Sequence, residues 1–128
     1  MNVVDSSAWL EFLADGPNTH IFAPPLLKTA ELLVPAVVVT EVTRKVLRER
    51  GPAAALQVRA LLEQGAIIEL DKHLAFLAAR LGVEHHLPLA DSMVYATARA
   101  FRATVWTQDE DFAGLAGVRY IPKVKPTT

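Results

Sequence analysis

The chain has 128 residues, 52% of them hydrophobic and 21% charged, which is typical of one globular domain with a substantial core. Its formal net charge of −1 gives no overall attraction for nucleic acid, so such binding would need a local basic patch. The lack of cysteine excludes disulfides, cysteine-ligated zinc and thiol nucleophiles. The sequence has neither a long apolar stretch nor a signal-peptide pattern, so we expect a cytoplasmic protein with no membrane contact.

Five short segments with strand character alternate with helical segments along the chain. The predicted strands are, in order, residues 2–5, 32–34, 66–70, 104–107 and 118–121. This alternation favours a parallel sheet, because each crossover between parallel strands lays a helix on one face of the sheet. We therefore predict the α/β class, with a single domain over residues 1–128, a central parallel sheet flanked by helices on both faces, and a short polar tail.

The helical segments carry start and stop residues. The predicted helices are, in order, a segment between Asp5-Ser6-Ser7 and Gly16-Pro17, residues 36–50, residues 53–64, a segment capped by Asp71 and ended by Gly82, and a segment from Pro88 to Phe101. Pro24-Pro25 interrupts residues 19–31, which we expect to form short helical pieces. In the last helix, an apolar stripe should face the sheet, made of Ala90, Met93, Val94, Ala98 and Phe101.

Four acidic residues lie near the points where strands pass into helices. Asp5 and Asp109 follow predicted strands directly, whereas Glu41 and Asp91 lie within the first two turns of helices. Helical side chains lean toward the helix N-terminus, so the latter two can reach back to the sheet edge. Parallel α/β sheets bind ligands at the edge where their strands end, and carboxylates suit Mg²⁺ or Mn²⁺. The pattern predicts a metal-dependent active site.

Each acid also has an ordinary structural explanation. These are a helix N-cap for Asp5, a favourable helix dipole for Asp91, a capping box between Thr107 and Glu110 around Asp109, and a pair with Lys45 for Glu41. As a set they are harder to explain in this way, because uncompensated carboxylates at one edge repel each other and raise each other's pKa values. A divalent cation would remove that conflict.

Four motifs resemble those of PIN-domain nucleases in order and spacing. They are Asp5-Ser6-Ser7 after an apolar strand, Thr40-Glu41-Val42, residues 89–96 (LADSMVYA) and residues 107–112 (TQDEDF). The match covers nearly the whole chain, whose size is similar to that of VapC-type toxins. The resemblance implies Mg²⁺- or Mn²⁺-dependent endoribonuclease activity, with Asp5, Asp91 and Asp109 as metal ligands and Glu41 completing the acidic cluster. It gives accessory roles to three more residues, Ser6, Thr107 and Asp111. It also implies a homodimer with a small antitoxin as partner.

Several further residues keep two interpretations. Arg44, Lys45 and Arg48 lie near Glu41 on one helix and either bind RNA phosphates or form a solvated face. Tyr95 either stacks on a base or closes the edge of the fold. The pair His85-His86 is interpreted as a surface loop. Some of the apolar surface of the first two helical segments should exceed what the core can cover, and an exposed part would mark an interface; the residues concerned are Trp9, Phe12, Leu13, Phe22, Leu26 and Leu27.

Two other functions remain open from the residues alone. One is a Mg²⁺-dependent phosphohydrolase with Asp5 as a phosphorylated nucleophile, but position 7, where a second acid is expected, holds serine. The other is a catalytically silent PIN-like binding module. Acids at all four positions argue against the loss of activity that this second alternative requires.

Overall fold

One five-stranded sheet organises residues 1–125, the part of the chain that the structure, a computed structural model, describes. The strands are β1 (Asn2–Val4), β2 (Leu32–Pro35), β3 (Ala66–Ile68), β4 (Thr104–Thr107) and β5 (Val118–Tyr120). Their order is β3-β2-β1-β4-β5 and every neighbouring pair is parallel. All carboxyl ends therefore meet at one edge. The predicted fold class is confirmed; the predicted tail extends into residues 126–128, which lie outside the described part.

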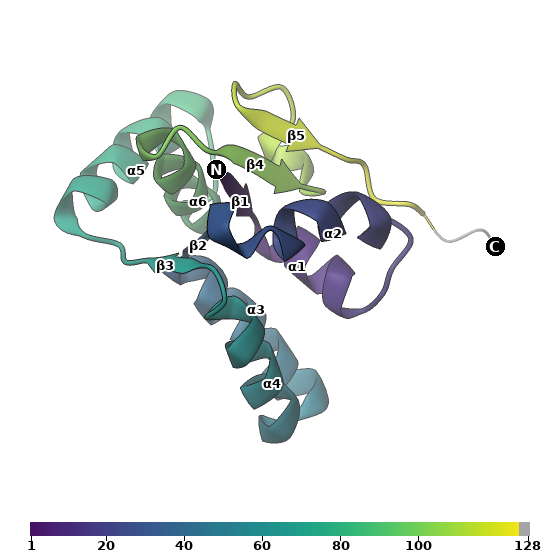
Figure 1. The fold of residues 1–128 in the computed structure, drawn as a ribbon. Coiled ribbons are helices and arrows are strands. Elements are labelled where there is room, and N and C mark those ends of the chain that lie inside the picture. Colours follow the sequence, from purple (N-terminus) through teal and green to yellow (C-terminus); the bar gives the residue numbers. More distant parts are fainter. Residues whose placement is uncertain (126–128) are drawn as a thin grey trace.

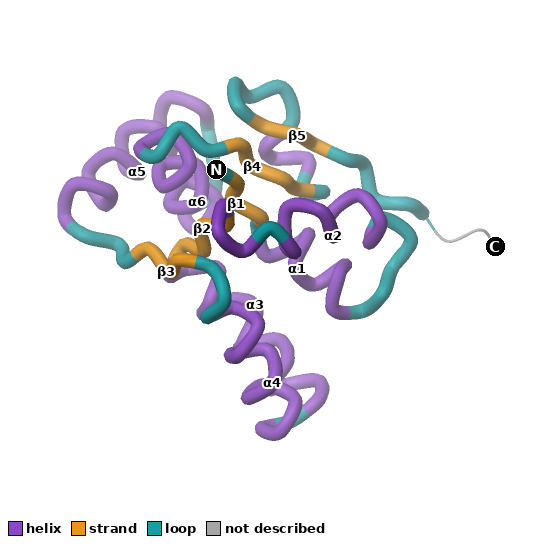
Figure 2. Tube along the Cα trace, viewed as in Figure 1, coloured by secondary structure: helices purple, strands orange, loops and turns teal. Residues whose placement is uncertain are grey.

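Within residues 1–125, six helices surround this sheet, and Figures 1 and 2 show their arrangement. They are α1 (Ser6–Leu13), α2 (Thr19–Leu27), α3 (Ala36–Arg50), α4 (Pro52–Leu62), α5 (Lys72–His85) and α6 (Leu89–Ala100), with short 3₁₀ turns η1 (Thr29–Glu31) and η2 (Glu110–Phe112). Figure 1 shows the α3–α4 hairpin projecting away from the sheet and α5 lying beside α6. None of the helices in residues 1–125 has the length and apolar character that crossing a membrane requires.

Strand order explains why both faces are covered. The connections from β1 to β2 and from β2 to β3 step in one direction along the sheet. The connection from β3 to β4 runs in the opposite direction and passes β2 and β1. Because parallel crossovers are right-handed, reversing direction moves the connecting helices to the opposite face. The central strands are buried accordingly, as expected for a parallel sheet between two helical layers, and Val3, Val34 and Val105 are inaccessible to solvent.

The prediction that Gly82 ends its helix was wrong. The α5 helix continues through Gly82 to His85, so this histidine is helical rather than in a loop, and the helix ends at His86 in the left-handed conformation (φ 55°). A Cβ atom placed on Gly82 would lie 3.0 Å from the Cβ of Ser92 on α6. The glycine therefore serves the close approach of α5 to α6, a tertiary contact that no local pattern reveals.

The stripe expected on α6 is only partly correct. Val94 and Ala98 are buried, but Phe101 is exposed at the helix end, and two polar residues, Ser92 and Thr97, are buried. Each hydroxyl donates its hydrogen bond within the helix: Ser92 donates to the carbonyl of Leu89, and Thr97 donates to that of Met93. Serine and threonine can thus occupy buried helical positions that an apolar stripe would not assign to them.

Tyr95 also has a structural role. Its side chain is buried, and its hydroxyl donates a 2.9 Å hydrogen bond to the carbonyl oxygen of Ala116 in the loop before β5. The ring of His85 packs edge-on against it, with centroids 5.5 Å apart. Base stacking by this ring is therefore excluded, and the alternative, that Tyr95 closes the edge of the fold, is confirmed.

The apolar surface expected to remain partly exposed on the first helices is small. Trp9, Phe22 and Leu26 belong to the buried core, and Leu27 is the member of the set that is well exposed. The α2 helix also differs from the expected short pieces, because it runs through both Pro24 and Pro25 without interruption. Pro25 is buried on the side of α2 that packs against α1 and the sheet, whereas Pro24 is exposed.

Candidate metal centre

Asp5 is placed by the passage from β1 into α1. Its backbone N–H donates to the carbonyl of Trp106 (3.1 Å) and so extends the pairing with β4. Its side chain caps α1, because Oδ1 accepts hydrogen bonds from the amide of Ala8 (3.2 Å) and the hydroxyl of Ser7 (2.7 Å). The predicted N-cap is confirmed. Both bonds are made to Oδ1, so the cap leaves Oδ2 outside them, and capping does not compete with ligation.

Asp109 and Asp111 are placed by the turn that follows β4. The hydroxyl of Thr107 accepts the amide of Asp109 (2.9 Å), and Asp109 Oδ1 accepts the amide of Asp111 (3.0 Å). Asp109 itself therefore caps η2, rather than the predicted capping box between Thr107 and Glu110. This short turn brings both carboxylates to the same side of the sheet edge.

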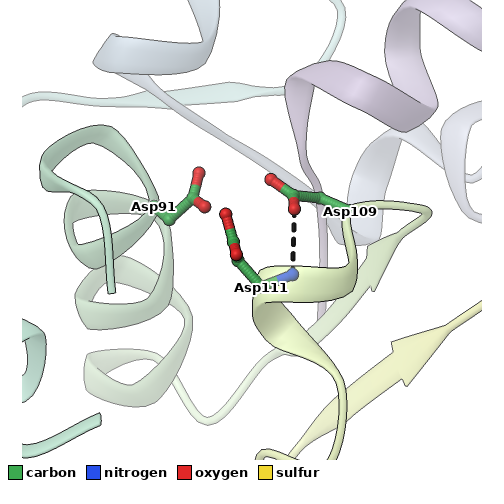
Figure 3. Close-up of side chains that lie close together, drawn as sticks. All are labelled: Asp91, Asp109 and Asp111. Carbon is green, nitrogen blue, oxygen red and sulfur yellow. Dashed lines mark hydrogen bonds between the residues drawn. The ribbon is translucent and has the colours of Figure 1, made fainter. Parts of the chain in front are cut away.

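Asp91 meets these two carboxylates from the first turn of α6. One carboxylate oxygen from each of Asp91, Asp109 and Asp111 lies within 4.8 Å of the others. Figure 3 shows the carboxylates of Asp91 and Asp111 directed toward each other, with Asp109 beside them. Three oxygen donors at this spacing, coming from a helix and a turn far apart in sequence, fit a hard divalent cation such as Mg²⁺ or Mn²⁺.

The electrostatics of the cluster match the repulsion expected from the sequence. Burial, together with the charge of Asp109, a hydrogen bond to it and the charges of Asp5 and Asp111, raises the pKa of Asp91 to about 8. Burial likewise raises the pKa of Asp5 to about 6, against the opposing effect of the hydrogen bonds that it accepts from Ser7 and Ala8. No positive side chain contributes to either pKa. The carboxylates thus lack a compensating charge among the described residues, and a bound cation would supply one.

Glu41 is not part of the group of close carboxylate oxygens. It is half-buried on α3 and lines a groove of about 330 Å³ together with Ser6 and Leu10 of α1 and the basic residues Arg44, Lys45 and Arg48. Its expected pairing with Lys45 is not formed, since the Lys45 ammonium lies 3.4 Å from Glu49 instead. The groove leaves both interpretations of the basic residues open.

Sequence reasoning missed the contribution of Ser7, whereas the accessory role predicted for Ser6 stays a prediction. Ser7, rather than Ser6, contacts Asp5, and its Oγ also accepts the amide of Gln108 (3.2 Å) and lies 3.4 Å from the hydroxyl of Thr107. Ser7 thus joins the end of β1 to the loop after β4, the two segments that carry Asp5 and Asp109. The role of Asp111 was likewise underestimated, because its oxygen belongs to the close group. The Asp-x-Asp spacing at the end of a strand was the available signal.

A second missed feature is the buried amide of Asn18, which is 4% exposed. Its Nδ2 donates to Oε1 of Gln108 (3.1 Å) and to the carbonyl of Pro122 (3.0 Å). Asn18 therefore fastens the segment after β5 to the loop that carries Asp109. No sequence signal links position 18 to partners about a hundred residues away.

Comparison with known proteins identifies a family and a set of similar folds. The model of the PIN domain matches residues 3–118. A toxin–antitoxin complex from Klebsiella pneumoniae contains a chain with 22% identity and a TM-score of 0.78, covering 93% of this chain and 96% of that one. VapC20 from Mycobacterium tuberculosis, described as a sarcin–ricin loop cleaving toxin, gives 20% identity and a TM-score of 0.73, with 93% and 99% covered.

A further similar fold occurs in VapBC2 from Rickettsia felis, bound to a DNA fragment from its promoter. Identity is 14% and the TM-score 0.73, with 96% of this chain and 98% of that chain covered. At these identities the structural likeness establishes a shared fold. No curated protein is matched by sequence.

Proposed function

Since this chain belongs to the PIN-domain family, we propose that it hydrolyses RNA phosphodiester bonds as a Mg²⁺- or Mn²⁺-dependent endoribonuclease. The observation that carries the proposal is the group of three carboxylate oxygens from Asp91, Asp109 and Asp111 within 4.8 Å of one another. An isolated group of this kind would be costly to ionise, as the raised pKa of Asp91 indicates. A divalent cation turns this unfavourable arrangement into a binding site.

In this proposal Asp5, Asp91 and Asp109 hold the metal, Asp111 supports it, and Glu41 completes the acidic rim. The metal would neutralise charge on the scissile phosphate and activate a water molecule. The protein's contribution is placement. Ser7 and the start of α1 orient Asp5, while the hydroxyl of Thr107 and the η2 turn orient Asp109. Carboxylates held in this way need little rearrangement to bind a cation.

We assign this activity to the toxin of a VapBC-type pair. The similar structures from Klebsiella pneumoniae and Rickettsia felis are a toxin–antitoxin complex and a VapBC complex, which supports a small antitoxin as partner. The similar VapC20 is described as cleaving the sarcin–ricin loop, which supports a nucleolytic role. Because both the RNA substrate and a newly made antitoxin are met in the cytoplasm, we place the protein there.

A homodimer is part of the same proposal, and α5 offers a surface for it. Phe76 and Val83 are 77% and 79% exposed and lie seven residues apart, so they share one side of the helix. Large apolar side chains with this exposure, on one helical face, are typical of a contact surface. The α3–α4 hairpin carries further exposed apolar residues, Leu47 and Leu56, along a groove of about 620 Å³ that an antitoxin can cover.

Cleavage of a labelled single-stranded RNA in Mg²⁺ tests the proposal. Wild-type protein should cut it, EDTA should stop the reaction, and Asp91→Asn should lower the rate at least a hundredfold, as expected when a metal ligand is lost. Glu110→Gln is the matched control, because it removes an acid from the turn that carries Asp109 and Asp111 but lies outside the close group. It should keep the cleavage rate at saturating RNA. Equal rates for wild type and Asp91→Asn would refute the metal-site assignment.

The two alternatives receive no specific support. A phosphohydrolase needs an accessible nucleophile, whereas Asp5 is 3% exposed and its Oδ1 is held by Ser7 and Ala8. A silent binding module would gain nothing from the carboxylate repulsion recorded in the raised pKa of Asp91. Thermal unfolding with Mn²⁺ or EDTA distinguishes the second alternative, because a module without a metal site should unfold at the same temperature in both.

A further inference from the structure

A second groove adjoins the acidic cluster on the side opposite α3. It has a volume of about 540 Å³ and is lined by Asp109 and by residues of the segment after β5, including Tyr120, Lys123 and Lys125. Both lysines are exposed, and no ion pair holds either of them within residues 1–125. Their charges are therefore free to act on a ligand in the groove.

Topology fixes where this groove lies. All five strands are parallel, so the residue after β5 leaves the sheet at the edge where β1 and β4 deliver Asp5 and Asp109. Figure 1 shows β4 and β5 pointing to the same side, from which the segment after β5 departs. The buried amide of Asn18 holds the carbonyl of Pro122, which keeps this segment against the loop of Gln108 and Asp109.

Charge therefore follows a definite order along the sheet edge. The basic residues of α3 follow β2, Asp5 follows β1, Asp109 and Asp111 follow β4, and the two lysines follow β5, which is the strand order itself. From β2 to β5 there are three strand spacings of about 4.8 Å, so the strands that lead to the two basic grooves lie about 14 Å apart, with β1 and β4 between them. A polyanion crossing the edge would meet cations on both sides of the acidic cluster.

We propose that the groove between Asp109 and Lys125 holds the RNA strand on one side of the cleavage position, with Lys123 and Lys125 neutralising its phosphates. The inference rests on the proposed nuclease function and extends it to the substrate path. Single-stranded nucleic acid is held mainly by cations along its backbone, and an aromatic wall gives bases a stacking surface. The half-exposed ring of Tyr120 provides such a wall in this groove. Glu110, which also lines it, opposes the binding.

Salt-dependent binding tests the assignment directly. The protein carries Asp91→Asn, so that RNA is bound without being cut, and the affinity for a labelled single-stranded RNA is measured by anisotropy in Mg²⁺. For single strands the logarithmic salt slope changes by about 0.7 for each phosphate neutralised, so Lys123→Gln with Lys125→Gln should reduce it by about 1.4. Between about 50 and 200 mM salt, wild-type lysines should therefore make the loss of affinity about 7-fold larger.

The control variant removes two positive charges from the opposite edge. Lys28 and Arg102 precede β2 and β4, and both are exposed. Asparagine replaces Arg102 because its φ of 53° suits that residue. Lys28→Gln with Arg102→Asn should leave the slope as it is, and Glu110→Gln should tighten binding. An unchanged salt slope in the Lys123/Lys125 variant would overturn the inference, and an acidic protein segment would then be the remaining candidate ligand of the groove.

The outcome separates this inference from the nuclease proposal. If wild-type protein cuts RNA while the two lysines leave the salt slope unchanged, the groove assignment fails and the nuclease stands. If the slope falls as expected but wild-type protein never cuts RNA in Mg²⁺ or Mn²⁺, the nuclease proposal fails and an RNA-binding groove remains. Circular dichroism of each variant confirms folding, which substitution of exposed residues should preserve.

Discussion

The carboxylate cluster should make the metal-free protein less stable than its own Asp91→Asn variant near pH 8. The pKa of Asp91 is about 8 in the folded protein against an ordinary value of 3.8. A carboxyl group whose folded pKa is raised favours folding most at low pH, and this contribution disappears as the pH rises through the folded value. The window therefore runs from about pH 4 to about pH 8, and asparagine, which does not titrate, is free of the penalty.

The size of the effect follows from the same difference. Transmitted in full, a carboxyl pKa of about 8 would cost about 4 kcal/mol at pH 7. Asp91 is partly exposed, so water screens its interactions and only a fraction of this cost should be felt. We therefore expect Asp91→Asn to stabilise the protein by about 1–2 kcal/mol in EDTA near pH 8.

Urea unfolding at several pH values measures this difference. In EDTA the advantage of Asp91→Asn should shrink between pH 8 and pH 5, and with Mn²⁺ the order should reverse, because only the wild type gains binding energy. Glu110→Gln serves as the control and should follow the wild type at each pH. A variant that is less stable than wild type in EDTA at pH 8 would refute the reasoning, since the carboxylates would then not be in conflict.

Two further predictions concern the support of the site and its assembly. Ser7→Ala removes the hydrogen bond to Asp5 and the one from Gln108, so it should destabilise the protein by about 1–2 kcal/mol and slow RNA cleavage. Ser6→Ala is the control and should change stability and cleavage rate little. Equal effects of the two substitutions in unfolding and cleavage assays would contradict the assignment. Phe76→Lys combined with Val83→Lys should convert a dimer to a monomer in light scattering at micromolar concentration, and a wild-type monomer would refute the dimer.

The sheet could be predicted from the sequence because each strand is a short apolar run with helical segments around it. Such a pattern is local, and the rules for parallel crossovers then fix much of the topology. Asp5 and Asp109 could be placed for the same reason, since each follows a strand and all parallel strands end at one edge. Asp91 required the additional rule that helical side chains lean toward the N-terminus of their helix.

The features that sequence reasoning missed depend on contacts between distant segments. Gly82 has the local appearance of a helix stop, but its proximity to Ser92 on the neighbouring helix determines its role. Tyr95 is buried because the carbonyl of Ala116, in a later loop, accepts its hydroxyl. Ser7 and Ser6 are equivalent as cap residues, and only the position of the loop after β4 shows which serine faces Asp5.

Titration calorimetry with Mn²⁺ at pH 7 tests the central claim, that these carboxylates form a metal site. Wild-type protein should bind saturably and release protons as the metal displaces those held by the raised pKa of Asp91, seen as a dependence of the heat on the ionisation enthalpy of the buffer. Proton release should decline above about pH 8, and Asp109→Asn should weaken binding strongly. Heats that do not saturate, or equal binding by Asp109→Asn, would contradict the account.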